Sequence, residues 1–297
     1  MKQKTGRQII STIIDIKNEC ESGDVKSFTI ELGIYNAKFE AKPGQFVMVW
    51  ILGIDEIPMS ISDLNYTYNE QLNIYTNHLV ISVKKVGDAT EKFHALKIGD
   101  KIGIRGPFGN SYSLKPGIAI IVGGGVGSAS IKFLIKSTML EENRKLLTNV
   151  FIIEGCKTAK ELLFKDWLQS QIEQSSLSFC TDDGSFGHAG FCSARLKNLV
   201  EDLLTQRTDP KSITVYACGP EKMLYSLFTI CEQFNIELQA SLERWMRCAF
   251  GVCGLCALEP TGLLVCKDGP IFSSKILRNI DEFGKYQRDL TGKKYKL

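Results

Sequence analysis

Apolar and polar residues alternate in short runs over the first third of the chain. The runs are IISTIIDI, SFTIEL, QFVMVWIL, HLVISVKKV and DKIGIRG, and Pro43-Gly44 and Gly106-Pro107 mark turns between or after them. Short runs rich in β-branched residues and divided by turn residues are typical of antiparallel strands. We therefore expect residues 1–114 to form an all-β domain, either a barrel or a sandwich.

After Pro116-Gly117 the pattern changes to continuous apolar runs that alternate with helical segments. The apolar runs are IAIIVGGG, NVFIIEG, LSFCTDDG and SITVYACGP, and helices are expected near residues 128–140, 162–168, 195–204 and 221–234. Continuous Val and Ile runs between helices indicate strands that are buried on both faces, as in a parallel sheet. This pattern predicts a doubly wound α/β domain over residues 115–238. Residues 239–297 then form a cysteine-containing segment and a Lys-rich tail that we expect to be solvated.

The composition is that of an ordinary globular protein. The 297 residues include 44% hydrophobic and 23% charged residues, and the chain is long enough for more than one core. The net charge of +3 is spread thinly, which argues against nucleic-acid binding. Ser11, Thr12 and Asp15 interrupt the N-terminal apolar stretch, so it does not resemble a signal peptide. No apolar run reaches the roughly 20 residues of a membrane span. We therefore expect a cytoplasmic protein without a membrane contact.

Four of the ten cysteines form a cluster near the C-terminus. Cys248, Cys253 and Cys256 have C-x4-C-x2-C spacing, and Cys266 follows, which matches the plant-type [2Fe–2S] arrangement. A structural zinc site is the alternative, but zinc ribbons usually present two separated cysteine pairs. Because such a cluster relays single electrons, the chain should also hold an organic cofactor or face one on a partner. The other cysteines are expected to be buried thiols: Cys20, Cys156, Cys180, Cys192, Cys218 and Cys231.

A glycine-rich turn follows the first apolar run of the α/β domain. Glycines in this place let the backbone approach a phosphate at the start of a helix. The same residues also fit a tight turn without a ligand, because the strict G-x-G-x-x-G spacing and a ribose-binding acid are missing. Two further loops end apolar strands at the same edge of the sheet, where such folds bind ligands. The candidate nucleotide-site residues are Gly123, Gly124, Gly125, Gly127, Asp182, Cys218, Gly219 and Pro220.

The order of these features resembles the ferredoxin reductase-like flavoproteins. The stretches SLERWMRCAFGVCGLC and VCKDGPIF are similar to those of the electron-transfer subunits of heteromeric, NAD-linked dihydroorotate dehydrogenases. The resemblance covers nearly the whole chain. It implies an FAD-binding β-barrel, a domain of the kind that binds NAD, and a C-terminal [2Fe–2S] loop.

The same resemblance implies a role in pyrimidine biosynthesis. Electrons would pass from dihydroorotate to FMN on a separate catalytic subunit, then to the cluster and to FAD, with NAD⁺ as the expected acceptor. The implied assembly is a heterotetramer with two copies of each subunit. The chain would serve as the redox subunit of an oxidoreductase, and we assign it no catalytic residue and no ability to oxidise dihydroorotate alone.

The family's Arg-Pro-x-Ser flavin motif corresponds to Ile57, Pro58, Met59 and Ser60. Ile57 replaces the arginine, which would grip the flavin pyrophosphate. A second flavin segment corresponds to Ser82, Val83 and Lys84 along a strand and to Ala89 and Thr90 at a phosphate turn. Lys84 could partly replace the missing arginine. The resemblance also places Cys218 near the nicotinamide, although a buried structural thiol is an equally good interpretation.

Two alternatives share these features. The flavin and iron–sulfur subunit of a hydrogenase or of an NAD(P)H:ferredoxin oxidoreductase has the same architecture, but Cys248 as first ligand and the VCKDGPIF stretch favour the dihydroorotate family. An iron–sulfur adaptor that has lost its flavin is the other alternative, because Ile57 and the altered glycine loop depart from the flavoprotein pattern.

Overall fold

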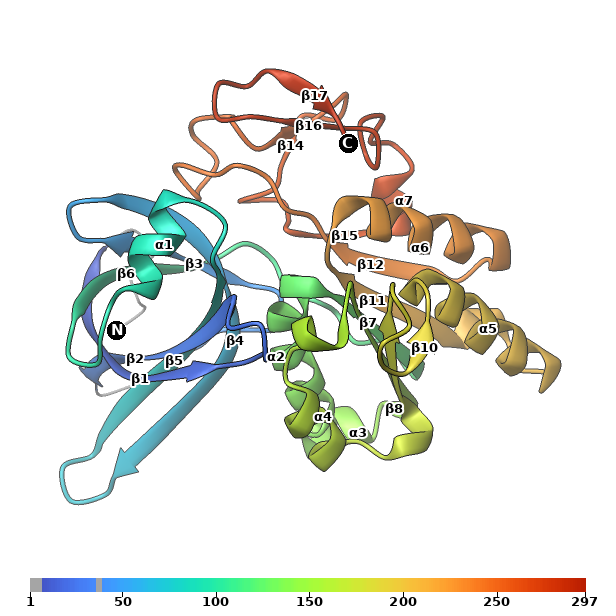
Figure 1. The fold of residues 1–297 in the computed structure, drawn as a ribbon, viewed down its shortest axis with the longest axis horizontal. Helices are drawn as coiled ribbons and strands as arrows, with labels where there is room; N and C mark the ends of the chain where they lie inside the picture. Colours follow the sequence, from blue (N-terminus) through green and yellow to red (C-terminus); the bar gives the residue numbers. More distant parts are fainter. Residues whose placement is uncertain (1–6, 36–38) are drawn as a thin grey trace.

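The computed structural model describes residues 7–35 and 39–297 (Figure 1). Residues 1–6, the beginning of the stretch considered above as a possible signal peptide, lie outside the described residues. In the part that is described, none of the helices has the length and apolar character needed to cross a membrane. The chain forms a barrel, an α/β layer and a C-terminal segment that lies over both (Figure 1).

The first unit is a closed antiparallel barrel, as the resemblance implied. Strand order around it is β1-β2-β5-β4-β3-β6, and alternate residues such as Val49, Ile61 and Ile104 are buried in its interior. The short helix α1 (Asp88–His94) covers the barrel, where the Phe93 ring packs edge-on against Phe28 at 4.5 Å. The strands are β1 (Ile9–Asn18), β2 (Val25–Tyr35), β3 (Phe46–Ile51), β4 (Asp55–Asn69), β5 (Ile74–Lys84) and β6 (Lys101–Phe108).

The second unit is a doubly wound sheet, which confirms the predicted fold class. Its order is β10-β9-β8-β7-β11-β12-β15, and every neighbouring pair is parallel except β12 with β15. Residues of α2 (Ser128–Thr138) and α4 (Lys165–Gln171) pack in one core, and those of α5 (Cys192–Thr205) and α6 (Glu221–Phe234) pack in another. The strands are β7 (Gly117–Gly124), β8 (Leu147–Cys156), β9 (Leu177–Thr181), β10 (His188–Ala189), β11 (Ile213–Cys218), β12 (Glu237–Ser241) and β15 (Ile271–Ser273); α3 (Glu141–Arg144) follows α2.

The C-terminal segment shares the α/β sheet. The expected boundary at residue 238 falls within β12, and β15 returns from the segment to pair with β12, with Ser241 opposite Ile271. We call the excursion between these strands, residues 242–270, the cysteine lobe. It contains the small hairpin of β13 (Ala257–Leu258) and β14 (Leu263–Leu264).

The tail after β15 is folded against the rest of the protein. It forms α7 (Ser274–Leu277) and a hairpin of β16 (Tyr286–Arg288) and β17 (Lys294–Lys296). Phe283 is buried, and its ring lies 5.6 Å from the rings of Tyr225 and Phe228 on α6. The expected solvated tail agrees with the hairpin, whose residues are exposed or half-buried, but Phe283 departs from it because its ring anchors the tail to α6.

A buried ion pair fixes the start of the cysteine lobe. Glu221 in the first turn of α6 accepts hydrogen bonds from two nitrogens of Arg244, and both side chains are only 3% exposed. The same carboxylate accepts from the backbone N–H of Gly284 and the side chain of Gln287, both at 2.9 Å. One carboxylate thus joins α6, the beginning of the lobe and the tail.

We expect Arg244→Met to lower the free energy of unfolding by about 3–5 kcal/mol, because the Glu221 carboxylate then stays buried without its partner. Urea denaturation monitored by circular dichroism measures the change. Lys145→Ala is the control, since it removes an exposed ion pair with Glu141 and should cost less than about 1 kcal/mol. Equal effects of the two substitutions would contradict this role of Arg244.

Candidate functional site

The four clustered cysteines lie as two pairs. The thiols of Cys248 and Cys253 are within hydrogen-bonding reach of each other, and so are those of Cys256 and Cys266. Within residues 7–35 and 39–297, no three His, Cys, Asp or Glu side chains are gathered as ligands of one metal ion. A zinc site needs four ligands around one centre, whereas a [2Fe–2S] cluster divides four thiolates between two irons. The two pairs therefore fit a binuclear cluster better than a single zinc ion.

The backbone around Cys248 is shaped to surround a sulfur atom. Ala249, Gly251 and Gly254 have positive φ angles of 67°, 86° and 71°, so the chain curls tightly after the first cysteine. The Val252 N–H donates to Cys248 Sγ at 3.3 Å, and the Cys266 N–H donates to Cys256 Sγ at 3.4 Å. Such N–H groups stabilise the thiolate form that binds metal.

These hydrogen bonds change the acidity of the first thiol. Partial burial raises the pKa of Cys248, but N–H groups of Cys253, Phe250 and Val252 outweigh it and lower the pKa to about 6. Cys266 behaves differently, because burial, followed by its contact with Cys256, raises its pKa to about 12. The fold thus favours the thiolate form of Cys248 at neutral pH, before any metal binds.

The loop has a buried side and an exposed side. Cys256 and Cys266 are each 2% exposed and belong to the same apolar core as Met48 and Phe108 of the barrel. Cys253, in contrast, is exposed. Beside it in the chain, Val252 is 76% exposed. One side of the cysteine loop therefore faces the barrel and the other faces solvent.

The predicted flavin segment lies on β4 beside this junction. Pro58 is the strand partner of Met48, and Ser60 is the partner of Phe46. Directly opposed residues share one face of a sheet, and Phe46 and Met48 belong to the core shared with the cysteine lobe. Pro58 and Ser60 therefore face the same side as these two residues.

Ile57 and Met59 have a different environment. Both are half-buried and pack against the apolar core of the barrel interior. Ile57 opposes Val49, which is fully buried in that core. Where the family motif has a cation, this chain thus places an apolar side chain that packs with the barrel.

In the second flavin segment, polar groups are used for internal hydrogen bonds. Ser82 Oγ lies 2.7 Å from Ser27 Oγ and donates to Ser62 Oγ at 3.2 Å, and Val83 is buried beside it. Lys84 lies 3.9 Å from the Glu161 carboxylate of the α/β unit. The structure therefore joins Lys84 to an acid rather than leaving its charge unpaired.

Thr90 organises the expected phosphate turn. Its hydroxyl accepts from the N–H groups of Val86 and Gly87 at 2.9 and 3.0 Å and donates to the Gly87 carbonyl at 2.8 Å. Ala89, beside it, packs against the barrel core. A methyl group at Gly87 would meet no other atom within 4 Å, so the backbone of the turn borders open space.

The glycine loop is explained mostly by contacts within the protein. A methyl group at Gly123 would clash with the Glu154 carboxylate, one at Gly124 with Met223, and one at Gly127 with the Cys218 backbone. Only at Gly125, among these glycines, would a methyl group meet open space, and its φ of +53° favours glycine. Gly125 is therefore the glycine of this loop whose surroundings leave room for a ligand.

The structure brings this loop together with the loop after β11. A methyl group on Gly219 would approach Gly124 and Met223 closely, and Pro220 lies next to Gly124. Cys218 is 2% exposed, and burial raises its pKa to about 12. A thiol with such a pKa is unreactive, which supports the structural interpretation of Cys218.

Asp182 lies farther along the same edge of the sheet. Its N–H donates to the Cys156 carbonyl at the end of β8, and the residue is exposed. The next residue, Asp183, instead accepts hydrogen bonds from the N–H and hydroxyl of Ser185 at 3.0 and 2.6 Å. The loop therefore presents Asp182 while Asp183 holds the turn.

Glu154 is a site residue that the sequence analysis missed. It lies two residues before the end of β8 as the strand partner of Gly123, is 3% exposed, and accepts a hydrogen bond from the Ser128 hydroxyl at the start of α2. Burial raises its pKa to about 7, although the bond from Ser128 lowers it. An acid at the end of an apolar strand beside a glycine turn was the available signal in NVFIIEG.

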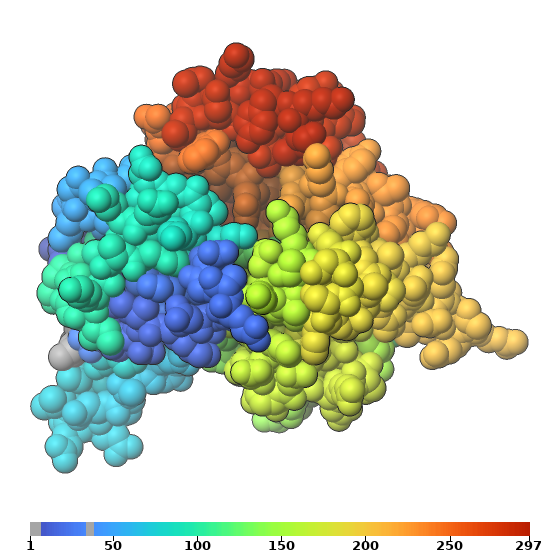
Figure 2. Space-filling model, in the orientation of Figure 1, coloured from blue at the N-terminus to red at the C-terminus, as the bar shows by residue number. Residues whose placement is uncertain are grey.

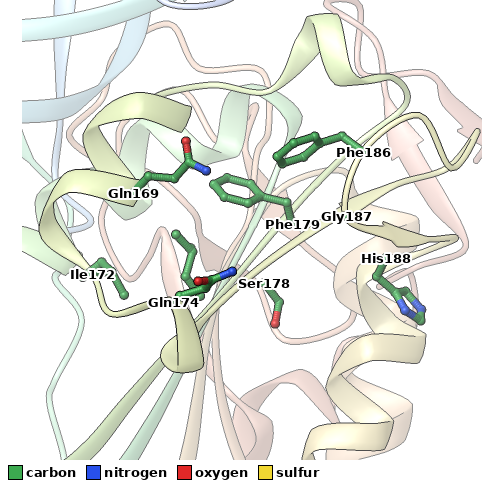
Figure 3. A pocket seen from close by; sticks show the side chains of 9 residues that line it. Gln169, Ile172, Gln174, Ser178, Phe179, Phe186, Gly187 and His188 are labelled. Carbon is green, nitrogen blue, oxygen red and sulfur yellow. The ribbon is translucent and has the colours of Figure 1, made fainter.

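A separate hollow of about 490 Å³ contains no predicted site residue (Figure 3). The rings of Phe179 and Phe186 lie side by side in it with centroids 5.6 Å apart, and Gln169 of α4 projects nearby (Figure 3). It lies at the β9–β10 edge of the sheet. A different surface is hollowed where the barrel, the α/β unit and the C-terminal segment meet (Figure 2).

Comparisons with known proteins match separate parts of the chain to two families. Residues 13–112 match the oxidoreductase FAD-binding domain, and residues 243–278 match the iron–sulfur cluster binding domain of dihydroorotate dehydrogenase B. These matches correspond to the barrel and to the segment that carries the cysteines.

Similar proteins and structures cover most of the chain. A Methanocaldococcus jannaschii protein named probable dihydroorotate dehydrogenase B (NAD(+)), electron transfer subunit, is 39% identical and covers 92% of this chain and 93% of its own. A protein of the same name from Methanocella arvoryzae is 36% identical and covers 98% of this chain and 100% of its own. A solved structure described as an NADH-dependent reduced ferredoxin-NADP oxidoreductase has a TM-score of 0.68 at 25% identity, covering 95% of this chain and 91% of that one.

The buried Glu154 predicts a pH-dependent effect on stability. Its pKa is raised to about 7 in the folded protein from an ordinary value of 4.5, so folding favours the protonated acid. Below pH 4.5 the acid is protonated in both the folded and the unfolded protein, so its burial costs no stability. As the pH rises from 4.5 through 7, the free energy of unfolding falls by about 3 kcal/mol, and it changes little above that range. We expect Glu154→Gln to be more stable than the wild type at pH 8 by a larger margin than at pH 5, as measured by urea denaturation. A margin that does not change with pH would contradict this environment for Glu154.

Proposed function

The chain belongs to the family of electron transfer subunits of dihydroorotate dehydrogenase B, and we propose that it carries electrons from a catalytic partner subunit to NAD⁺. The observation that carries the proposal is the packing of the cysteine loop. Its buried cysteines share one apolar core with Phe46 and Met48, the strand partners of Ser60 and Pro58. The metal-binding loop and the flavin segment therefore adjoin one surface.

When bound, FAD exchanges electron pairs with a nicotinamide and single electrons with an iron–sulfur cluster, which is why the two groups work together. Cys248 and Cys253 would hold one iron, and Cys256 and Cys266 would hold the other. The N–H groups around Cys248 keep its sulfur anionic, and the apolar core excludes water from the buried pair. The chain thus supplies ligands, orientation and a dry environment.

The flavin would occupy the hollow between the three units (Figure 2). Pro58 and Ser60 would border it through side chains, and Ile57 and Met59 through their backbone. The turn at Gly87, held by Thr90, would receive the phosphates because its backbone borders open space. Ser82, Val83, Lys84 and Ala89 would support this surface from the barrel.

NAD⁺ would bind along the carboxyl edge of the parallel sheet. Gly125, after β7, borders open space, and Asp182 is exposed after β9, which is separated from β7 by β8. The remaining residues of these loops, Gly123, Gly124, Gly127, Cys218, Gly219 and Pro220, would shape the site through their mutual packing. This division of roles follows from which positions have room beside them.

The partner would be a catalytic subunit that carries FMN, in a heterotetramer of two copies of each chain. We place its contact at the exposed side of the cysteine loop, which is formed by Cys253 and its neighbour Val252. Phe250 and Val252 are 53% and 76% exposed, and burying such apolar surface favours association. All ten cysteines are free thiols, which suits the reducing cytoplasm as the site of action.

The proposed function predicts how the chain behaves with its partner. After anaerobic copurification, we expect FAD, FMN and about two irons per copy of this chain. Dihydroorotate should bleach the flavin and cluster absorbance, and NAD⁺ should restore it. Cys266→Ser should lose iron and the reduction of FAD by dihydroorotate while FAD content stays unchanged.

Cys231→Ser is the matched control, because Cys231 is equally buried but lies on α6 outside the loop. A chain that purifies without flavin would favour the adaptor alternative. Reduction by NADPH or ferredoxin but not by dihydroorotate would favour an NAD(P)H:ferredoxin oxidoreductase. This alternative is considered because the solved structure of a ferredoxin-NADP oxidoreductase has a similar fold, with a TM-score of 0.68.

The docking surface predicts a second result. Val252→Asp should weaken the complex with the catalytic subunit at least about tenfold, because the interface would have to bury a charge. Isothermal titration calorimetry measures the affinity, and iron and FAD content should not change. Leu72→Asp is the control: Leu72 is 65% exposed and sits in the turn between β4 and β5, away from the loop. Equal affinities of the two variants would rule out this docking surface.

A further inference from the structure

One arginine of the barrel contacts the cysteine loop. Arg105 on β6 donates from Nη1 to the main-chain oxygen of Cys248 at 3.1 Å. Its Nε and Nη2 donate to the two carboxylate oxygens of Glu56 on β4 at 3.0 and 2.6 Å. The side chain is 11% exposed and its guanidinium carbon lies 5.2 Å from the centroid of the Phe108 ring. Both edges of the guanidinium are therefore occupied.

The strand register explains why this arginine reaches both partners. Met48 on β3 opposes Arg105 on one side and Pro58 on the other, so the three residues form a row on one face of the barrel. Glu56 precedes Pro58 by two residues and shares its face. The Glu56–Arg105 pair thus lies between the flavin segment and the first cysteine of the loop.

A guanidinium suits this place better than an ammonium group. Its planar fork can bind a carboxylate with two parallel hydrogen bonds and still donate to a third acceptor, whereas a lysine offers one mobile charge. The pair also puts a positive and a negative charge beside the loop. Each charge acts on the loop electrostatically, and the two act in opposite directions.

We propose that Glu56 and Arg105 are positioning residues that fix the cysteine loop against the flavin segment and set the reduction potential of the cluster held there. This inference rests on the proposed function, because it concerns the same cluster. Arg105 acts through the Cys248 backbone, and Glu56 acts by orienting Arg105 and balancing its charge. Neither residue is assigned a bond to a reacting group.

The test compares Glu56→Gln, Arg105→Gln and Arg278→Gln in the complete complex. Arg278 is the matched control, because it makes the same two-pronged contact with Glu232, at 2.6 and 2.8 Å, on an exposed surface away from the loop. Iron and FAD are quantified first. The cluster potential is then measured by a redox titration followed by electron paramagnetic resonance.

We expect opposite shifts in the two test variants. Glu56→Gln leaves the arginine charge unbalanced, which favours the more negative reduced cluster and raises the potential. Arg105→Gln leaves the carboxylate unbalanced and lowers it. A tenfold change in the ratio of reduced to oxidised cluster at a fixed potential corresponds to about 59 mV for one electron, and we expect shifts of this order. Arg278→Gln should leave the potential unchanged.

Hydrogen exchange measures positioning without the cluster. In metal-free protein, Arg105→Gln and Arg105→Lys should both raise amide exchange in residues 248–256 several-fold, and Arg278→Gln should not. If the Arg105→Gln variant binds no iron, its potential cannot be measured. The inference is then tested by amide exchange in metal-free Arg105→Gln and by the rise in cluster potential of Glu56→Gln. Shifts in the same direction, absent shifts, or unchanged loop exchange overturn the inference. A wild-type chain without iron and FAD would instead refute the proposed function.

Discussion

The apolar core shared by three parts of the chain determines the rest of the structure. Phe46, Met48 and Phe108 are barrel residues, but they pack outside the barrel's interior core, in one continuous cluster with Cys256 and Cys266. The same cluster includes residues of α5, α6 and the buried strands of the sheet. Because closely packed interiors transmit small displacements, the position of the cysteines depends on both the barrel and the sheet. The chain therefore holds its metal-binding loop through packing as well as through the loop's own sequence.

Local patterns predicted the architecture but not every element. Runs of period two gave the barrel strands, and continuous apolar runs gave the parallel sheet, because burial on one or two faces leaves different signatures. β4 was missed as a strand because it carries Pro58, a residue that is depleted in strands; Pro58 lies near the start of β4, where the strand pairs with β3 and its pairing with β5 has not yet begun. The anchoring of the tail was missed because Phe283 is a single aromatic residue in a stretch of mostly charged and polar residues. In both places, contacts distant in the chain outweigh local preference.

The candidate site divides in the same way. Cysteine spacing predicted the loop, because its ligands are close in sequence and the spacing itself carries the geometry. Arg105 and Glu154 were not predicted, since their roles depend on partners that are distant in the chain. The glycine loop is a third case. Its residues resemble a phosphate-binding turn, yet Gly123 and Gly127 are required by the neighbouring carboxylate and backbone. A glycine motif can thus record close packing as readily as ligand binding.

The way in which the cysteine lobe is attached has a consequence for modularity. Both ends of residues 242–270 meet at the edge of the sheet, where Ser241 and Ile271 are opposite each other in an antiparallel pair. In topological terms the lobe is a long insertion in a hairpin, and the entropic cost of closing such a loop rises only slowly with its length. A reductase fold can therefore gain or lose such a lobe without changing its strand order. The cysteine lobe is therefore an insertion in the fold, whereas the barrel and the sheet are the parts that define it.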